Sequence, residues 1–478
     1  MLSIFKDLFS KWHGHNIQYC NWKGTAKIEE GLEGLSDADV LVSLGQKGLV
    51  ESILVGCGFV KVNTQPYCKY SDIYDWIGND ARTGKLVHIH LHYRMIAGHP
   101  GIMEYSLPWS EQVLSSRVLL GDSVYTVNPN WELLIFLTRL GLEFPNKKID
   151  KKRYRLTESA LKEFNFIQTG CSDNDVSILF SDIYGEIGVE LKEVAYKKEL
   201  TKSDFVFLKR TFVTVFSNRV SNLLYTIRSQ VKTFIHIYVE PRFDFCKSMY
   251  LKKYFDNGIV IAFMGQDGSG KSTVSKDINK WLSWKLEAKR FYLGSGEHFN
   301  PWEKRLGNRL ALKSGGLVKA IRAILSFRQI KKISDYSCRN LKTAFKYRDK
   351  GGIALLDRYP QTQFAGINDG PKIRTSVLPK VKNSRFLSAI ATWYAAREEK
   401  KLAEAVKLQP DIVFKLMLPP EESIRRKPKE NYESVCRKHE IMKQLAFPQS
   451  KVYEIDATMP YEEELILIKN IIWKNILK

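Results

Sequence analysis

The sequence predicts a mixed α/β protein with a doubly wound, mostly parallel sheet in its C-terminal half and an α+β domain with a helical appendix in its N-terminal half. Its 478 residues are too many for one ordinary domain, so two or three domains are expected. From residue 258 onward, apolar runs typical of buried strands alternate with helical patterns, whereas residues 126–200 show helical spacing only. We therefore expect four segments, at 1–125, at 126–200, at 201–257 as a basic helical linker, and at 258–478.

The composition is typical of a globular protein in water, with 44% apolar and 26% charged residues. No segment approaches the roughly 20 apolar residues needed to cross a bilayer. Residues 1–16 lack an apolar core and a small-residue cleavage site, which argues against a secretory signal. The seven cysteines form no C-x-x-C pair, so we expect reduced thiols and a cytoplasmic location.

The chain is strongly basic, with a net charge of +22 from 74 basic and 52 acidic residues. Such an excess attracts phosphates, nucleic acids or an anionic membrane surface, and it does not choose among them. No recognised nucleic-acid-binding motif accompanies the charge. A protein that binds nucleic acid and is switched by a nucleoside triphosphate therefore ranks third among our interpretations.

The N-terminal segment has the pattern of a mixed domain. A strand is expected at 17–22 and a helix at 47–56, with the apolar run 40–42 between them. Further strands are expected at 58–62, 72–77 and 86–93.

A pair of carboxylates in this segment indicates metal chemistry. Asp37 and Asp39 stand two residues apart at the start of an apolar run, and residues so spaced on a strand point to the same face. Two convergent carboxylates, with the small turn Gly24-Thr25 upstream to admit a triphosphate, suit Mg²⁺-dependent nucleotidyl transfer. A D-x-D pattern alone is common at strand edges, and the glycine turn strengthens it.

This spacing, Gly24-Thr25, eleven residues, then Asp37-x-Asp39, resembles the signature of the nucleotidyltransferase superfamily, and the wider layout resembles a bacterial subgroup of it. The resemblance implies that residues 1–125 are a nucleotidyltransferase-like domain in which the two aspartates bind Mg²⁺ and the turn contacts the nucleotide.

The family also uses a third carboxylate on a later strand, where this chain reads VHIHLHY. His90 is our candidate for that position, as a metal ligand. His88, His90 and His92 share one face of the expected strand and could instead form a metal-binding or phosphate-binding face, or only the polar face of a half-buried strand. An inactive nucleotidyltransferase that still binds a ligand is a further alternative.

Helices are expected at 131–142, 156–166 and 177–193, as an appendix packed against the first domain. The stretch 205–239 is basic and amphipathic. It could lie on an anionic membrane surface, although we favour a helix between domains with a solvated basic face.

The strongest motif lies at 259–273, which reads IVIAFMGQDGSGKST. A buried strand, a glycine-rich turn and a helical pattern follow one another, as in the phosphate-binding loop G-x-x-x-x-G-K-[ST]. Lys271 would neutralise phosphate oxygens and Ser272 would supply a hydroxyl to Mg²⁺. The motif predicts binding of a nucleoside triphosphate through Gly265, Gln266, Gly268, Ser269, Gly270, Lys271, Ser272 and Thr273.

Alternating elements continue from this motif to the end of the chain. Strands are expected at 289–293, 353–356, 411–418 and 451–455, a basic helical section at 304–350, a helix at 384–407 and a helix at the C-terminus. In such sheets, ligands bind at the carboxyl ends of the strands.

This half resembles the thymidylate kinase family along nearly its whole length. The motifs are the phosphate loop with Asp267 at its third position, Asp357-Arg358-Tyr359, the P-D strand at 410–411 with P-P-E at 419–421, and I-D-A at 455–457. The arginines of the family's lid match Arg425, Arg426 and Arg437.

The resemblance implies roles for these residues in an ATP- and Mg²⁺-dependent kinase. Asp357 would hold the Mg²⁺ shell, Arg358 would grip the acceptor's anionic group, and Asp267 would hydrogen-bond an acceptor hydroxyl. The lid arginines would close over the transferred phosphoryl group. A dimer also follows from the kinase resemblance.

The departures from the family concern the acceptor. After D-R-Y the chain reads PQTQFAG, without the family's base-reading glutamine, and GSGE at 294–297 replaces the family's arginine-bearing loop. Residues 368–371, NDGP, add an acidic loop. We therefore expect a sugar, polyol or other small hydroxyl compound as the acceptor of the kinase. If the N-terminal half is also active, it would transfer a nucleotidyl group to a related substrate, a hypothesis motivated by the fusion of the two halves in one chain. The alternative is a true nucleoside monophosphate kinase.

Overall fold

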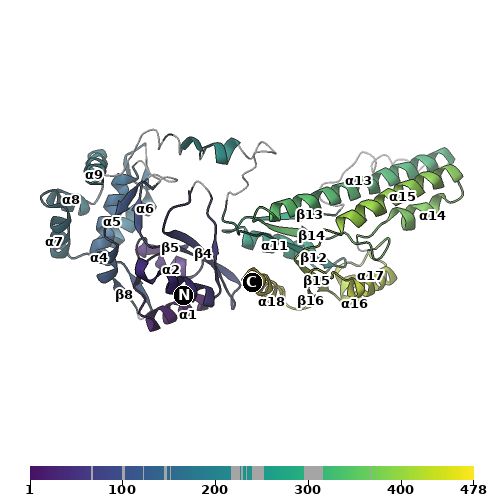
Figure 1. Ribbon diagram of the computed structural model, residues 1–478, viewed down its shortest axis with the longest axis horizontal. Coiled ribbons are helices and arrows are strands. Elements are labelled where there is room, and N and C mark those ends of the chain that lie inside the picture. Colours follow the sequence, from purple (N-terminus) through teal and green to yellow (C-terminus); the bar gives the residue numbers. More distant parts are fainter. Residues whose placement is uncertain are drawn as a thin grey trace. The chain divides into compact units, whose positions relative to one another are not determined.

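The structure is a computed structural model (Figure 1), and the chain divides into two compact units, Met1–Lys253 with Trp473–Lys478, and Tyr254–Ile472. It describes residues 1–65, 68–98, 103–121, 123–144, 148–150, 152–216, 227, 230–232, 234–239, 252–294, 316–367 and 369–477. Several expected features lie outside these residues in whole or in part. They are much of the linker at 201–257, the loop at 295–297, the start of the basic section at 304–315 and Asn368.

The described part of the first unit contains a seven-stranded mixed sheet in the order β3-β4-β5-β2-β1-β9-β8. Its two central strands, β2 and β5, are parallel, and their register sets Asp37 beside His88 and Asp39 beside His90. The strands in sheet order are β3 Phe59–Val62, β4 Ile73–Asp80, β5 Lys85–His92, β2 Asp37–Val42, β1 Tyr19–Asn21, β9 Val124–Thr126 and β8 Val118–Leu120.

Short helices and hairpins complete this sheet domain. They are α1 Ser3–Gly14, α2 Ile28–Leu32, α3 Lys47–Gly56, the single turns Thr25–Lys27 and Leu44–Gln46, and the hairpins β6 Met95–Ala97 with β7 Tyr105–Leu107 and β10 Ile149–Asp150 with β11 Arg155–Leu156. α1 is amphipathic: Phe5, Phe9 and Trp12 are buried, and the ring of Phe9 stacks on Tyr19 of β1 at 5.3 Å. Burial of these rings fixes α1 on the sheet.

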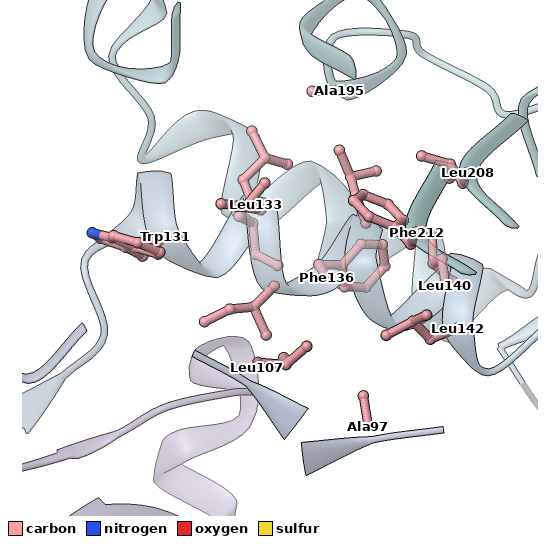
Figure 2. Packing of buried hydrophobic residues seen from close by; sticks show 14 of the residues in the cluster. Ala97, Leu107, Trp131, Leu133, Phe136, Leu140, Leu142, Ala195, Leu208 and Phe212 are labelled. Carbon is pink, nitrogen blue, oxygen red and sulfur yellow. The ribbon is translucent and has the colours of Figure 1, made fainter. Parts of the chain in front are cut away.

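A second core of the first unit lies among its helices, α4 Ser110–Ser115, α5 Pro129–Leu142, α6 Glu158–Thr169, α7 Asp173–Tyr184, α8 Ile187–Ala195 and α9 Lys202–Val215. Figure 2 shows α5 at its centre, with Leu133, Phe136 and Leu140 in the cluster beside Phe212 of α9. Asn128 caps α5 by accepting from the amide of Asn130 at 2.9 Å, and proline occupies the first turn. The expected helix at 131–142 is thus confirmed.

The prediction of a single helix at 177–193 is wrong, because the chain forms two helices there, α7 and α8, with a break between them. Gly185 has a φ of +59° there, which only glycine adopts at little cost. A Cβ on Gly188 would lie 2.3 Å from the carbonyl oxygen of Phe180, so the helices also need a small residue where they cross. The helix expected from 205 begins at Lys202, and α9 ends at Val215.

The second unit contains a parallel five-stranded sheet in the described residues, in the order β13-β14-β12-β15-β16. The strands are β12 Ile259–Gly265, β13 Ala288–Tyr292, β14 Ile353–Asp357, β15 Ile412–Met417 and β16 Lys451–Asp456. The helices are α11 Lys271–Leu282, α13 Gly316–Arg348, α14 Leu378–Val381, α15 Arg385–Ala405, α16 Pro420–Arg426, α17 Tyr432–Gln444 and α18 Tyr461–Ile476, with a helical turn at Ile373–Val377. The expected parallel sheet is confirmed.

The connections of this sheet place helices on both of its faces. The chain runs from β12 past β14 to the edge strand β13 and then returns to β14. Because crossovers between parallel strands are right-handed, this reversal puts α11 and α13 on opposite faces. α13 and α15 pack side by side (Figure 1), and α18 lies with α11, since Tyr461 donates to Asp277 at 2.6 Å. A crevice therefore opens at the carboxyl ends of β12 and β14.

Among the described residues, no helix combines the length and apolarity that a membrane span requires.

Candidate active sites

A cavity of about 180 Å³ lies in the crevice at the carboxyl ends of β12 and β14. Its wall brings together residues that are more than 170 positions apart in the chain and that carry both signs of charge. The lining residues are Met264, Gly265, Gln266, Asp267, Lys271, Arg358, Gly366, Ile367, Asp369, Lys372, Lys438 and Met442.

The loop between β12 and α11 requires glycine at three positions. Gly268 and Gly270 have φ of +88° and +86°, the left-handed region in which side chains are strained. A Cβ on Gly265 would lie 2.4 Å from Ser269 Oγ and 2.8 Å from the carbonyl oxygen of Leu416. The hydroxyl of Ser269 is buried and has no hydrogen-bond partner among the described residues. A loop of this kind directs backbone amides inward and suits an anion.

Lys271 opens α11, and its ammonium faces the same cavity. The side chain is buried, and Nζ donates to the carbonyl oxygen of Gln266 at 2.7 Å. Burial, with the charge of Arg358 nearby, lowers the pKa of Lys271 to about 8. Gln266 is itself held by the carbonyl oxygen of Leu418 and by His439, whose Nδ1 lies 3.2 Å from Gln266 Oε1. A bound anion would relieve the cost of this buried charge.

Asp357 and Arg358 end β14 beside the loop. Asp357 is fully buried: its Oδ2 accepts from Arg290 of β13, while Oδ1 has no partner among the described residues. Arg358 has a φ of +77°, a strained conformation outside glycine. The carboxylate of Asp369 lies 3.4 Å from Arg358 Nη1 and is the main reason that the pKa of Arg358 is raised. The sequence did not single out Arg290, because its partner lies 67 residues away.

Asp267 lies across the cavity, between two cations. Its Oδ2 accepts from Lys438 of α17 at 2.8 Å, and Arg358 Nη2 lies 3.9 Å from Oδ1. Burial raises the pKa of Asp267, but Lys438 and its other cationic neighbours outweigh burial and hold that pKa below its usual value. The sequence missed Lys438 and Lys372, which belong to no motif and reach the cavity only through tertiary packing.

The three lid arginines have different surroundings. Arg426 donates to the carbonyl oxygens of Gly268 at 3.3 Å and Ala457 at 3.0 Å, so it contacts the loop. Arg425 is exposed and pairs with Glu422 at 2.7 Å, and Arg437 is exposed on α17. Ser272 and Thr273 are exposed in the first turn of α11.

The residues of the second unit fit a nucleoside triphosphate with Mg²⁺. The glycine loop leaves room for phosphate oxygens, and Lys271 and Arg358 supply positive charge. Asp357 Oδ1, which has no partner among the described residues, is an oxygen ligand of the kind that Mg²⁺ prefers, and Ser272 stands at the start of the same helix as Lys271.

A second cavity, of about 340 Å³, lies in the first unit and is lined in part by residues of β1 and β2. It contains Gly24, Asp37 and Asp39 of the expected signature. Thr25 is held beside it, since its amide donates to the buried carboxylate of Glu132 at 2.9 Å. Basic groups share the wall with these acids: Lys23, Lys27, Arg139 and Lys148.

Each aspartate of the D-x-D pair contacts different histidines of β5. His88 lies between two carboxylates, 2.8 Å from Asp37 Oδ1 and 2.7 Å from Asp75 Oδ1. Burial disfavours its charged form, but these carboxylates outweigh burial and raise the pKa of His88. The sequence missed Asp75, which the pairing of β4 with β5 brings to this face.

Asp39 is surrounded by cationic and imidazole groups. Its Oδ1 lies 3.0 Å from Lys23 Nζ, 3.1 Å from His90 Nδ1 and 3.4 Å from His92 Nε2. Burial of Asp39 acts against ionisation, but Lys23 and these hydrogen bonds hold its pKa well below the usual value. Burial lowers the pKa of His92 to about 3. The polar face expected for this strand is therefore organised around three carboxylates: Asp37 and Asp75 at His88, and Asp39 at His90 and His92.

No family model matches the chain. It is 28% identical over 218 residues to the uncharacterized ATP-binding protein YghR of Escherichia coli, a match that covers 43% of this chain and 83% of that protein. It is 24% identical over 226 residues to the uncharacterized ATP-binding protein YghS of the same species, covering 43% and 89%.

Solved structures of deoxyadenosine kinase from M. mycoides, with bound dATP and with bound dCTP, show 18% and 19% identity at TM-scores of 0.28 and 0.27. Each match covers 45% of this chain and 99% or 98% of the other.

Proposed function

We propose that the second unit is an ATP- and Mg²⁺-dependent phosphotransferase. One observation carries the proposal: Gly265, Asp267 and Lys271 of the glycine loop line one cavity together with Arg358, at the topological switch point of the sheet. Asp357 directly precedes Arg358 at the end of β14. The relatives named as ATP-binding proteins support the same donor.

In this proposal each side chain has a defined task. The loop amides and Lys271 bind the phosphates and neutralise charge that develops on the transferred group. When bound, Mg²⁺-ATP supplies the phosphoryl group, and Asp357 and Ser272 would hold the ion. Arg358, fixed by Asp369, orients an anionic group of the acceptor. Asp267 accepts a hydrogen bond from the acceptor hydroxyl, and Arg426 supports the loop from outside.

The cavity favours a polar acceptor over a nucleobase. The described residues that line it include no aromatic ring, so they offer no stacking platform for a base. Asp267 and Asp369 can accept hydrogen bonds from hydroxyls, and Lys372 and Lys438 can bind an anionic substituent. We propose a sugar, polyol or other small hydroxyl compound. A nucleoside monophosphate is the alternative.

Transfer from γ-labelled ATP to a panel of sugars, polyols, their phosphates and nucleoside monophosphates tests this proposal. We expect transfer to a hydroxyl compound by the full-length chain, and Lys271→Met to lower it by about 100- to 1,000-fold. Lys280→Ala, an exposed lysine of the same helix α11, is the matched control and should transfer normally. Efficient phosphorylation of thymidine monophosphate would refute the proposed acceptor class.

Nucleotidyl transfer by the first unit is a second candidate. Asp37, Asp39 and the turn Gly24-Thr25 stand at one 340 Å³ cavity whose basic residues suit a triphosphate. In the coupled form of this proposal, one unit phosphorylates a hydroxyl and the other transfers a nucleotidyl group to a related substrate. If Lys271→Ala abolishes every turnover and Asp37→Ala with Asp39→Ala changes none, the coupled proposal fails.

We also propose a cytoplasmic location, a dimer and a peripheral contact with an anionic membrane. For the third interpretation, binding to mixed-sequence DNA or RNA with a steep salt dependence would support a nucleic-acid partner.

A further inference from the structure

We propose that Asp39, His90 and His92 form a binding site for a divalent transition-metal ion in the first unit. This site shares Asp39 with a Mg²⁺ site at the Asp37 and Asp39 carboxylates, but its other two ligands are imidazoles and its metal class is different. It is also independent of the proposed kinase function of the second unit.

The three candidate ligand atoms form a nearly equilateral triangle. His90 Nδ1 lies 3.1 Å from Asp39 Oδ1, His92 Nε2 lies 3.4 Å from the same oxygen, and the two nitrogens are 3.2 Å apart. A metal ion with ligands at about 2.1 Å separates neighbouring ligand atoms by about 3.0–3.4 Å, in tetrahedral or octahedral geometry. The cluster therefore has the dimensions of one face of a coordination polyhedron before any ion is placed.

The strand register creates this triangle. Asp39 of β2 pairs with His90 of β5, and His92 follows two positions later on the same face. The third histidine of that face, His88, is occupied by Asp37 and Asp75 and lies outside the group. The three alternate histidines therefore have different surroundings: His88 lies between two carboxylates, whereas His90 and His92 both lie beside the carboxylate of Asp39.

The ligand types select the metal. Two imidazoles and one carboxylate suit Zn²⁺, Mn²⁺ or Fe²⁺, whereas Mg²⁺ prefers oxygen ligands. Two facing imidazole nitrogens within 3.2 Å need a proton or a cation between their lone pairs. The Nδ1 of His92 is buried without a partner among the described residues, so Nε2 is the nitrogen that meets the cluster.

The site is open on one side. Asp39 lines the 340 Å³ cavity, and about a quarter of the side-chain surface of Asp39 (24%) and His90 (28%) is exposed, whereas His92 is buried. Three protein ligands leave further coordination positions for water or for a ligand from the cavity. Lys23 contacts the same oxygen of Asp39 at 3.0 Å, so an entering ion has to displace its ammonium group.

Metal binding to the purified full-length chain tests the proposal without any enzyme assay. After chelation and removal of metals, we expect about one equivalent of Zn²⁺ per chain by elemental analysis, and Co²⁺ to give a visible absorption band that excess Mg²⁺ does not displace. His90→Gln should raise the dissociation constant of Zn²⁺ by at least about 100-fold. His90 is the primary variant because it is partly exposed, and circular dichroism checks that the variant folds.

The matched control is His15→Gln, which removes an exposed histidine whose Nδ1 lies 2.9 Å from the backbone oxygen of Lys11 in α1, and it should bind Zn²⁺ like the parent. Lys23→Met should tighten binding by about tenfold, because it removes the competing cation. The proposal is overturned if the parent chain binds no Zn²⁺, or if folded His90→Gln binds Zn²⁺ as tightly as the parent.

Discussion

At the scale of single residues, two charged side chains near the cavity of the second unit, Lys271 and Asp357, are buried. Within the part of the chain that the structure describes, the buried Lys271 donates to the carbonyl oxygen of Gln266, and one carboxylate oxygen of Asp357 has no hydrogen-bond partner. Unsatisfied buried groups destabilise a free protein, so they indicate that a ligand completes the site.

The lowered pKa of Lys271 predicts proton uptake on nucleotide binding. At about pH 8 the free lysine is half protonated, and an anion beside it favours the charged form and raises its pKa. Binding of Mg²⁺-ATP near pH 8 should therefore take up about half a proton, measurable by titration calorimetry in buffers of different ionisation enthalpy. The uptake should shrink as the pH falls, because the lysine is then charged before binding. Proton release near pH 8 would contradict this view of Lys271.

Asp267 offers a second prediction at this scale. If its carboxylate accepts a hydrogen bond from the acceptor hydroxyl, Asp267→Asn should lower acceptor turnover by on the order of 100-fold. The dissociation constant of ATP should change only a few-fold, because the phosphate loop is intact. The control is Asp277→Asn, an acid of α11 that lies outside the cavity lining and binds Tyr461. Equal losses in ATP affinity and in turnover would assign Asp267 to the loop's structure.

At the scale of elements, the features that depend on local sequence pattern could be predicted from the sequence, whereas those that depend on tertiary contacts could not. The helix expected at 47–56 has the observed bounds of α3, and the strand expected at 353–356 is β14 with one further residue. The phosphate loop and the D-x-D pair could also be identified from the sequence, because the residues of each motif lie close together along the chain. Arg290, Lys438 and Asp75 were not, since each meets its partner only through packing or strand register.

The helix α5 positions part of the first unit's cavity and gives an element-scale prediction. It supplies Glu132, which holds Thr25, and Arg139, which lines the cavity. A Cβ on Gly141 would lie 2.6 Å from the carbonyl oxygen of Leu208 in α9, so Gly141→Ala should lower the free energy of unfolding by about 1–3 kcal/mol. Chemical denaturation measures the change.

Gly48→Ala is the control for this prediction. Gly48 lies in α3 with open space around its Cα, so alanine there should be neutral or stabilise the helix by up to about 1 kcal/mol. Equal effects of the two substitutions would show that α5 and α9 do not approach as closely as described.

At the scale of the whole molecule, the chain consists of two compact units, each with its own sheet and its own cavity. The two cavities are lined by different sets of charged residues. The cavity of the second unit combines a phosphate loop with cations and two carboxylates, whereas that of the first unit has aspartates held by histidines and lysine. We therefore expect ATP to bind the second unit and metal to bind the first independently of each other.

Titration of the full-length chain with Mg²⁺-ATP tests the central claim most directly. The account predicts saturable binding that Lys271→Met weakens by at least about 100-fold, while Lys280→Ala and His90→Gln bind like the parent. Absence of binding to the parent, or equal binding to Lys271→Met, would contradict it.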